Sequence, residues 1–157
     1  MTIRQHFGII FIALIVTTQS VWCQADAARH QNLKDGIALE GYDPVSYFHN
    51  APTKGKKELR YTYNGATYLF STTENLAEFQ ANPRKYEAAY GGWCAYAMGD
   101  TGEKVKIDPE TYKIVDSRLY LFYNFWGNNT LKSWNKDETR LRTAADRNWD
   151  NLIRTKR

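Results

Sequence analysis

The sequence predicts one small α+β domain in which two β-hairpins form an antiparallel sheet, short helices lie between them, and a helical segment ends the chain. The first hairpin is indicated by Asn64-Gly65, which lies between two runs rich in aromatic and β-branched residues. Both residues of this dipeptide tolerate the positive φ that a two-residue hairpin turn requires. A second pair of such runs, residues 112–115 and 119–123, predicts the second hairpin. From about residue 129 to 153, apolar side chains recur at helical spacing.

Two local signals predict short helices on either side of the first hairpin. Asp43-Pro44 begins one of them, because aspartate caps a helix and proline suits a first position that needs no N–H donor. Ser71, followed three residues later by Glu74, is typical of a capping box and predicts a helix through about Ala81.

Two more short helices are expected before the second hairpin. Asn82-Pro83 begins the first, and Gly91-Gly92 ends it. Residues 93–98 are predicted to form the second. In that helix Cys94 and Met98, four residues apart, would lie on one face.

The first residues of the chain resemble a secretory signal. Arg4 supplies a positive charge, and an uncharged, largely apolar stretch follows from Phe7 to Val16. This stretch is about ten residues long, whereas a membrane-spanning helix needs roughly 20, so a retained anchor is the weaker alternative. Small residues at Ala25 and Ala27 offer cleavage sites, of which we favour Ala25.

These features divide the chain of 157 residues into a signal peptide (1–25), a flexible leader (26–35) and one domain (36–157). The mature protein would be exported, either to the periplasm or out of the cell, with no stable membrane insertion after cleavage. The net charge is +4, and the basic residues are scattered among acidic ones. Such a pattern is typical of a solvated surface and argues against a nucleic-acid partner.

Cleavage would also remove Cys23 and leave Cys94 as the only thiol of the mature protein. A lone thiol in an exported protein is either buried as a small apolar side chain or has a task such as metal ligation or mixed-disulfide chemistry. Both alternatives stay open at the level of sequence.

Three blocks of the sequence together resemble the YHS domain family. They are residues 41–48 (Gly-Tyr-Asp-Pro-Val-Ser-Tyr-Phe), residues 61–86 with the ending Asn-Pro-Arg-Lys-Tyr, and residues 90–95 (Tyr-Gly-Gly-Trp-Cys-Ala). The segment 112–123 and the terminal helical segment are similar to the exported bacterial branch of this family. The resemblance implies a binding protein, because the better understood members are short metal-associated domains attached to heavy-metal transporters.

In those members cysteines serve as soft-metal ligands, and here Ser46, Ser71 and Asn75 stand at the corresponding positions. A serine hydroxyl is a poor ligand for zinc or copper(I), which prefer thiolate, imidazole or thioether. The thiolate site of the family therefore does not carry over to these three positions.

A different soft-metal site is one hypothesis for the ligand. Cys94, Met98 and His49 together would suit copper(I), and the first two have helical spacing in their favour. In the competing interpretation, Cys94 and Met98 are ordinary core residues.

A site without metal is the alternative. The aromatic and polar side chains of the two glycine-containing turns could surround a small molecule or a segment of a protein partner. The candidate ligand-binding residues are Tyr42, Asp43, Tyr47, Tyr90 and Trp93.

Enzymatic activity is not predicted. The sequence contains no nucleophile elbow, phosphate loop, HExxH pair or Cys-x-x-Cys motif. A thiol-dependent enzyme, with Cys94 as nucleophile, His49 as base and Asp43 orienting the imidazole, is the alternative that the sequence leaves open.

Overall fold

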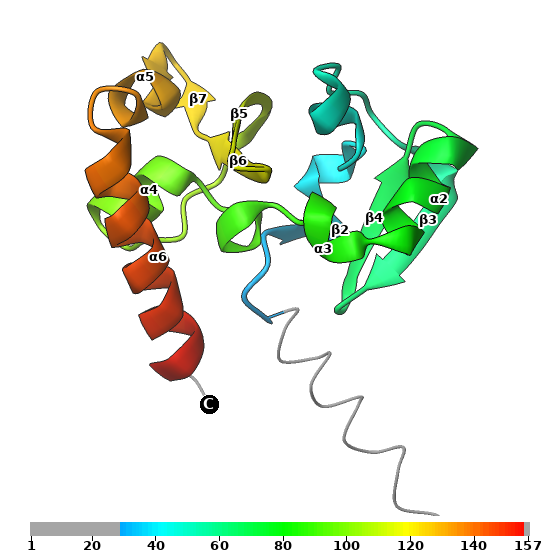
Figure 1. The fold of residues 1–157 in the computed structure, drawn as a ribbon, viewed down its shortest axis with the longest axis horizontal. Coiled ribbons are helices and arrows are strands. Elements are labelled where there is room, and N and C mark those ends of the chain that lie inside the picture. The colour runs from blue at the N-terminus through cyan, green and yellow to red at the C-terminus, as the bar shows by residue number, and fades with distance from the viewer. Residues whose placement is uncertain (1–28, 156–157) are drawn as a thin grey trace, which may run out of the picture.

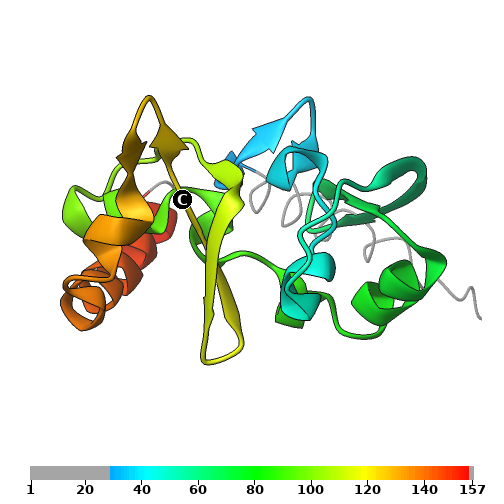
Figure 2. The ribbon, with the colours of Figure 1, turned by 90° about the horizontal axis from the view of Figure 1, so that it is seen from above.

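A computed structural model describes residues 29–155. It confirms the α+β class, with the elements arranged as two lobes (Figure 1, Figure 2). The N-terminal lobe contains the strands and helices up to residue 86, and the C-terminal lobe contains those from residue 95 onward. The predicted signal peptide and its cleavage site lie outside the described residues.

The N-terminal lobe is built on a four-stranded sheet of order β1-β2-β4-β3. Strands β2 and β4 pair in parallel, whereas the other neighbours are antiparallel. Asn64 and Gly65 form the turn between β3 and β4 with φ of 49° and 77°, which confirms the predicted first hairpin. The strands are β1 (Leu33–Lys34), β2 (Ile37–Ala38), β3 (Lys56–Tyr63) and β4 (Ala66–Phe70).

Short helices cover this sheet and lead to the second lobe. They are η1 (Leu39–Gly41), η2 (Ser46–His49), α2 (Thr73–Ala81), α3 (Pro83–Tyr86) and η3 (Ala89–Gly92). The predicted cap of α2 is wrong by one residue, because Thr72, not Ser71, accepts the hydrogen bond from the backbone N–H of Asn75, at 3.1 Å. The hydroxyl of Ser71 is bonded elsewhere, to a side chain 28 residues away in sequence.

The C-terminal lobe contains the predicted second hairpin and the predicted terminal helical segment. Its two long hairpin strands form a sheet of their own, so the two predicted hairpins do not join into one antiparallel sheet. A third, short hairpin lies between this second hairpin and the last two helices, and it was not predicted. The elements are α4 (Ala95–Asp100), β5 (Asp108–Val115), β6 (Arg118–Phe122), β7 (Asn124–Phe125), β8 (Asn128–Asn129), α5 (Thr130–Trp134) and α6 (Glu138–Thr155).

Strand β6 lies between two hydrophobic clusters and belongs to both. Leu119 and Leu121 are buried in the cluster that fills the N-terminal lobe, whereas Tyr120 and Phe122 are buried in the cluster under α4, α5 and α6. This follows from the strand period of two, which sends successive side chains to opposite faces. The two lobes therefore share one central strand.

The structure describes residues 29–35 of the predicted flexible leader, and these residues pack against the rest of the fold. His30 is buried, the backbone N–H of Asn32 donates to Gly91 O at 2.8 Å, and residues 33–34 form β1. The approach is this close because Gly91 has no side chain: a Cβ there would lie 2.8 Å from the carbonyl oxygen of His30.

Candidate functional site

The buried carboxylate of Asp43 is the centre of the polar site in the N-terminal lobe. Asp43 is fully buried, and it lies between η1 and η2, where the chain turns back toward the sheet. Its Oδ1 accepts a hydrogen bond from the backbone N–H of Val45 at 2.9 Å. This bond closes an Asx turn ahead of η2. The predicted cap at Asp43 is wrong, because Val45 is the residue that precedes η2 and no side chain caps that helix.

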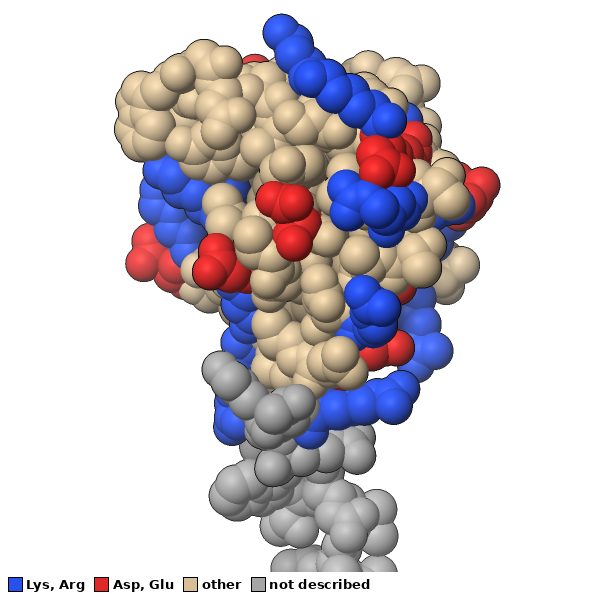
Figure 3. Space-filling model, turned by 90° about the vertical axis from the view of Figure 1, so that its left-hand side faces the viewer, with Lys and Arg blue, Asp and Glu red and all other residues tan. Residues whose placement is uncertain are grey.

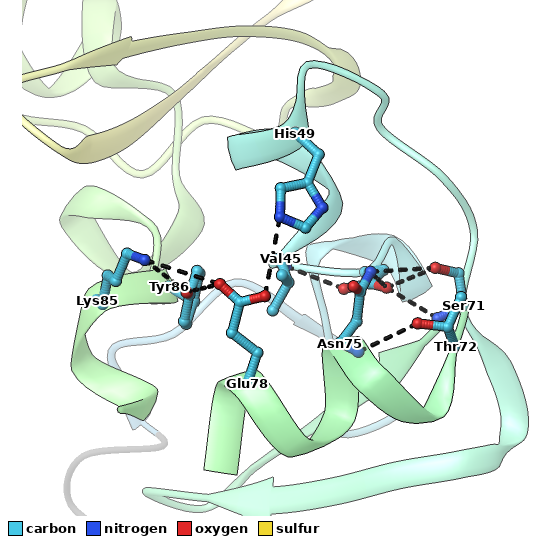
Figure 4. A network of polar contacts seen from close by, with 9 residues as sticks. Val45, His49, Ser71, Thr72, Asn75, Glu78, Lys85 and Tyr86 are labelled. Atoms are coloured by element: carbon cyan, nitrogen blue, oxygen red, sulfur yellow. Dashed lines mark hydrogen bonds and ion pairs between the residues drawn. The ribbon is translucent and has the colours of Figure 1, made fainter. Parts of the chain in front are cut away.

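The second carboxylate oxygen of Asp43 accepts three hydrogen bonds from residues on the other side of the lobe. Asp43 Oδ2 accepts from the backbone N–H of Ser71 at 2.8 Å, from the Ser71 hydroxyl at 2.7 Å and from the Asn75 side-chain amide at 2.7 Å. Figure 4 shows Val45, Ser71 and Asn75 gathered at this point, with Thr72 bonded to Asn75. Hydrogen bonds to a buried charge are among the strong ones, so this cluster ties the first turn to the end of β4 and to α2.

Ser46 completes the same cluster through the backbone. Its hydroxyl donates to the carbonyl oxygen of Asp43 at 2.7 Å and accepts from the backbone N–H of Thr53 at 3.0 Å. Ser46, Ser71 and Asn75, which the sequence resemblance pairs with metal-binding cysteines, are thus all bonded to Asp43. The sequence singled them out only as missing thiolates, and the fold gives each one a hydrogen-bonding role.

A second polar group extends from α2 to the surface. The Tyr86 hydroxyl donates a hydrogen bond to Glu78 Oε1, and Lys85 Nζ donates to the same hydroxyl at 2.7 Å. His49 Nε2 lies 3.8 Å from Glu78 Oε2, and both side chains are substantially exposed (Figure 4). Burial and the bond to Glu78 raise the pKa of Tyr86, so its hydroxyl keeps its proton at neutral pH.

The tyrosines that the sequence proposed as ligand-binding residues are buried, and their hydroxyls are bonded within the protein. Tyr42 donates to Glu110 Oε1 at 2.8 Å, Tyr47 to the carbonyl oxygen of Pro109 at 2.9 Å, and Tyr90 to Asp146 Oδ1 at 3.1 Å. These bonds join the N-terminal lobe and η3 to elements of the C-terminal lobe. Trp93 is half-buried, and its Nε1 donates to the carbonyl oxygen of His30 at 2.8 Å.

The surroundings of these three tyrosines raise the pKa of their hydroxyls. Burial raises the pKa of Tyr47 and the pKa of Tyr90 above the usual value. The hydrogen bond to Glu110, followed by burial, raises the pKa of Tyr42. All three therefore act as neutral hydrogen-bond donors and link the lobes.

Cys94 is closed off in the core. It is fully buried, its Sγ lies 3.4 Å from the Thr130 hydroxyl, and it accepts the backbone N–H of Tyr123 at 3.4 Å. The backbone N–H of Met98 donates to the Cys94 carbonyl at 3.0 Å. Cys94 is the N-cap of α4 and lies outside it, so the helix predicted over residues 93–98 begins two residues later, at Ala95. The two side chains nevertheless belong to different hydrophobic clusters.

The predicted copper ligands are not brought together. His49 faces Glu78 at the surface, with a side chain that is 54% exposed, whereas Cys94 has no exposed surface. Within residues 29–155, no group of three or more His, Cys, Asp or Glu side chains is placed to hold a metal ion. Because His49 faces Glu78 at the surface and Cys94 is buried, His49 is not placed as a base beside a Cys94 nucleophile either.

The fold and the Asp43 cluster define a small α+β module with a buried, hydrogen-bonded polar centre. Residues 43–90 match the family model of the YHS domain, and the chain therefore contains a YHS domain. The match begins at Asp43 and ends at Tyr90, so it covers the Asp43 cluster and not α4, β5–β8, α5 or α6. Comparisons with curated proteins and with solved structures gave no match.

Replacing Asp43 by asparagine is expected to destabilise the protein strongly. Asparagine keeps one accepting oxygen, so its N–H₂ group would face either the backbone N–H of Val45 or the donors of Ser71 and Asn75. The donors on that side would then lose their acceptor. We expect the free energy of unfolding to fall by about 3 kcal/mol, measured by urea denaturation. The matched control is Asp35→Asn, the same change at an exposed position of the β1–β2 turn, which should stay within about 0.5 kcal/mol. Equal effects of the two variants would contradict the role given to Asp43.

Proposed function

We propose that this protein is an exported YHS-domain binding module that recognises its partner at the surface and holds no soft metal, either at Ser46, Ser71 and Asn75 or at Cys94. The observation that carries the proposal is the engagement of Ser46, Ser71 and Asn75 with Asp43. YHS domains are generally associated with metal handling, and copper in particular. In this chain the same three positions stabilise the fold instead.

The chemistry of the donors supports this part of the proposal. Hydroxyl and amide groups are weak ligands for soft metals, and those of Ser71 and Asn75 already donate to a buried carboxylate. Metal binding there would require breaking the hydrogen bonds that hold α2 against the first turn. The cost of leaving Asp43 buried without its donors opposes such a rearrangement.

The lobe-linking tyrosines support recognition at the surface rather than in a tyrosine-lined pocket. Tyr42, Tyr47 and Tyr90 use their hydroxyls for internal hydrogen bonds. A small polar ligand bound by these groups would have to replace bonds that join the two lobes. A partner that binds exposed side chains has no such cost.

Export is supported by the N-terminal sequence, in which Arg4 precedes the apolar stretch of residues 7–16 and small residues follow. In residues 29–155, no helix is sufficiently long and apolar to cross a bilayer. We infer that the folded domain acts outside the cytoplasm after the signal is removed.

Copper(I) is expected not to bind through Cys94. Because the full chain carries two cysteines, the test uses Cys23→Ser, which leaves Cys94 as its only thiol, beside Cys23→Ser/Cys94→Ala. Alanine removes the sulfur and keeps a small apolar side chain in the core. A competitive copper(I) titration under reducing, anaerobic conditions should show no stoichiometric binding to either protein. The Cys94 thiol should react slowly with a thiol reagent because it is buried.

Stoichiometric binding that disappears with Cys94→Ala would contradict the proposal and restore copper handling as the function. Tight binding would also raise the free energy of unfolding with added copper(I), which gives a second, independent readout on the same samples.

The second prediction concerns processing. Expressed with its full N-terminus in a bacterial host, the protein should appear in the periplasmic or secreted fraction with Asp26 or Ala28 as its first residue, as determined by intact mass. Leu14→Arg, which interrupts the apolar stretch, should leave the chain inside the cell with residues 1–25 attached. Cytoplasmic, uncleaved protein without that substitution would refute export.

A further inference from the structure

The β7–β8 hairpin carries the most exposed apolar side chain of the described residues. Trp126 is 88% exposed, and the other large apolar side chain exposed in this part of the chain, Ile153, is 38% exposed. Tyr123 and Phe125 stand beside Trp126, with the Phe125 ring 6.0 Å from the Trp126 ring and 5.0 Å from the Tyr123 ring between centroids. Tyr123 and Phe125 are half-buried, so Trp126 extends a partly exposed aromatic group into solvent. Exposed apolar surface of this kind can mark an interaction site.

The backbone conformation at Trp126 is unusual for a large side chain. Trp126 and Gly127 form a two-residue turn with φ of 50° and 79°, a turn that asparagine followed by glycine suits best. A bulky side chain at positive φ is an outlier that costs stability. The fold therefore keeps a large ring at a place where neither burial nor local conformation favours it.

The body of the C-terminal lobe holds this hairpin in place. Thr130 donates to the carbonyl oxygen of Tyr123 through its backbone N–H at 3.0 Å and through its hydroxyl at 2.9 Å. The Asn124 side-chain amide donates to the Thr111 hydroxyl at 3.0 Å and to Asp108 at 3.3 Å. These hydrogen bonds brace the β7–β8 hairpin, which carries Phe125 and Trp126.

A cation accompanies the rings. Lys106 Nζ lies 4.7 Å from the centroid of the Phe125 ring and 5.3 Å from that of the Trp126 ring. Figure 3 shows a large uncharged area on the upper part of the face where α5 and α6 lie, with Lys and Arg side chains below its left-hand part. Apolar rings and positive charge are therefore found next to each other.

We propose that the β7–β8 hairpin is a peripheral membrane-binding tip for bilayers that carry anionic lipids. Trp126 and Phe125 would enter the interfacial region, and Lys106 would face the lipid phosphates. The inference rests on the proposed function, because it names the surface that the binding module recognises. Association of this kind is reversible, since it uses two rings and a charge and no spanning helix.

Two observations favour a lipid surface over other partners. The tip is convex and its largest ring is exposed on nearly all sides, whereas a small-molecule site is concave and encloses its ligand. A protein pocket that took up both rings would also desolvate Lys106, at a cost in free energy. The bilayer interface accepts both groups, because aromatic rings lie at the headgroup level and lysine extends its ammonium toward the phosphates.

The test is co-sedimentation of the full chain with vesicles. Every protein carries Leu14→Arg, so that the apolar stretch of residues 7–16 does not itself bind bilayers. With vesicles of phosphatidylcholine and phosphatidylglycerol in equal parts, Trp126→Asn should weaken binding by about tenfold or more, because apolar burial drives insertion. Asparagine suits positive φ, so the turn should be kept in this variant. Ile153→Gln, which removes the other exposed apolar side chain, should bind as the parent protein does.

The charge is tested separately. Lys106→Gln should weaken binding to the anionic vesicles by about fivefold and leave weak binding to pure phosphatidylcholine unchanged. Lys57→Gln, a matched loss of charge on exposed β3, should have no effect. Absence of vesicle binding, or binding that survives Trp126→Asn, would overturn the membrane tip. Either result would leave the metal-free YHS module standing, because the copper titration tests that part independently.

Discussion

The structure depends first on one buried carboxylate. Asp43 is removed from water, and a buried charge is tolerated only when donors replace the lost hydration. It gains them from Val45 at its own turn and from Ser71 and Asn75 on the far side of the lobe. This requirement sets where η2, the end of β4 and α2 lie relative to one another. It also gives the hydroxyl groups of Ser46 and Ser71 and the amide group of Asn75 a role in the fold.

The second constraint is strand β6, which is buried on both faces and joins the lobes. The family match ends at Tyr90, before this strand, so the C-terminal lobe adds to the YHS domain a second hydrophobic core and the braced β7–β8 hairpin. The polar centre is thus found in the matched segment, whereas the exposed aromatic tip around Trp126 belongs to the added lobe. The recognition surface that we propose therefore lies outside the segment that matches the family model.

The sequence predicted those features that depend on local chemistry. The turn at Asn64-Gly65 is an example, because its backbone preference needs no tertiary partner. The cap of α2 was misplaced, since the hydroxyl of Ser71 bonds to a residue that is distant in sequence. The β7–β8 hairpin was missed because Trp126 breaks the local rule for its turn. For the site, Cys94 and Met98 have the predicted helical spacing, but tertiary packing divides them between two cores.

The most direct test of the Asp43 cluster is amide hydrogen exchange, followed by NMR, at Val45 and Ser71. Both backbone N–H groups donate to the buried carboxylate. If this cluster holds the lobe together, they should exchange only through global unfolding, as slowly as the slowest amides of β6. Exchange as rapid as that of exposed turn amides would show that the cluster opens independently, and it would contradict the role of Asp43 as the centre of the fold.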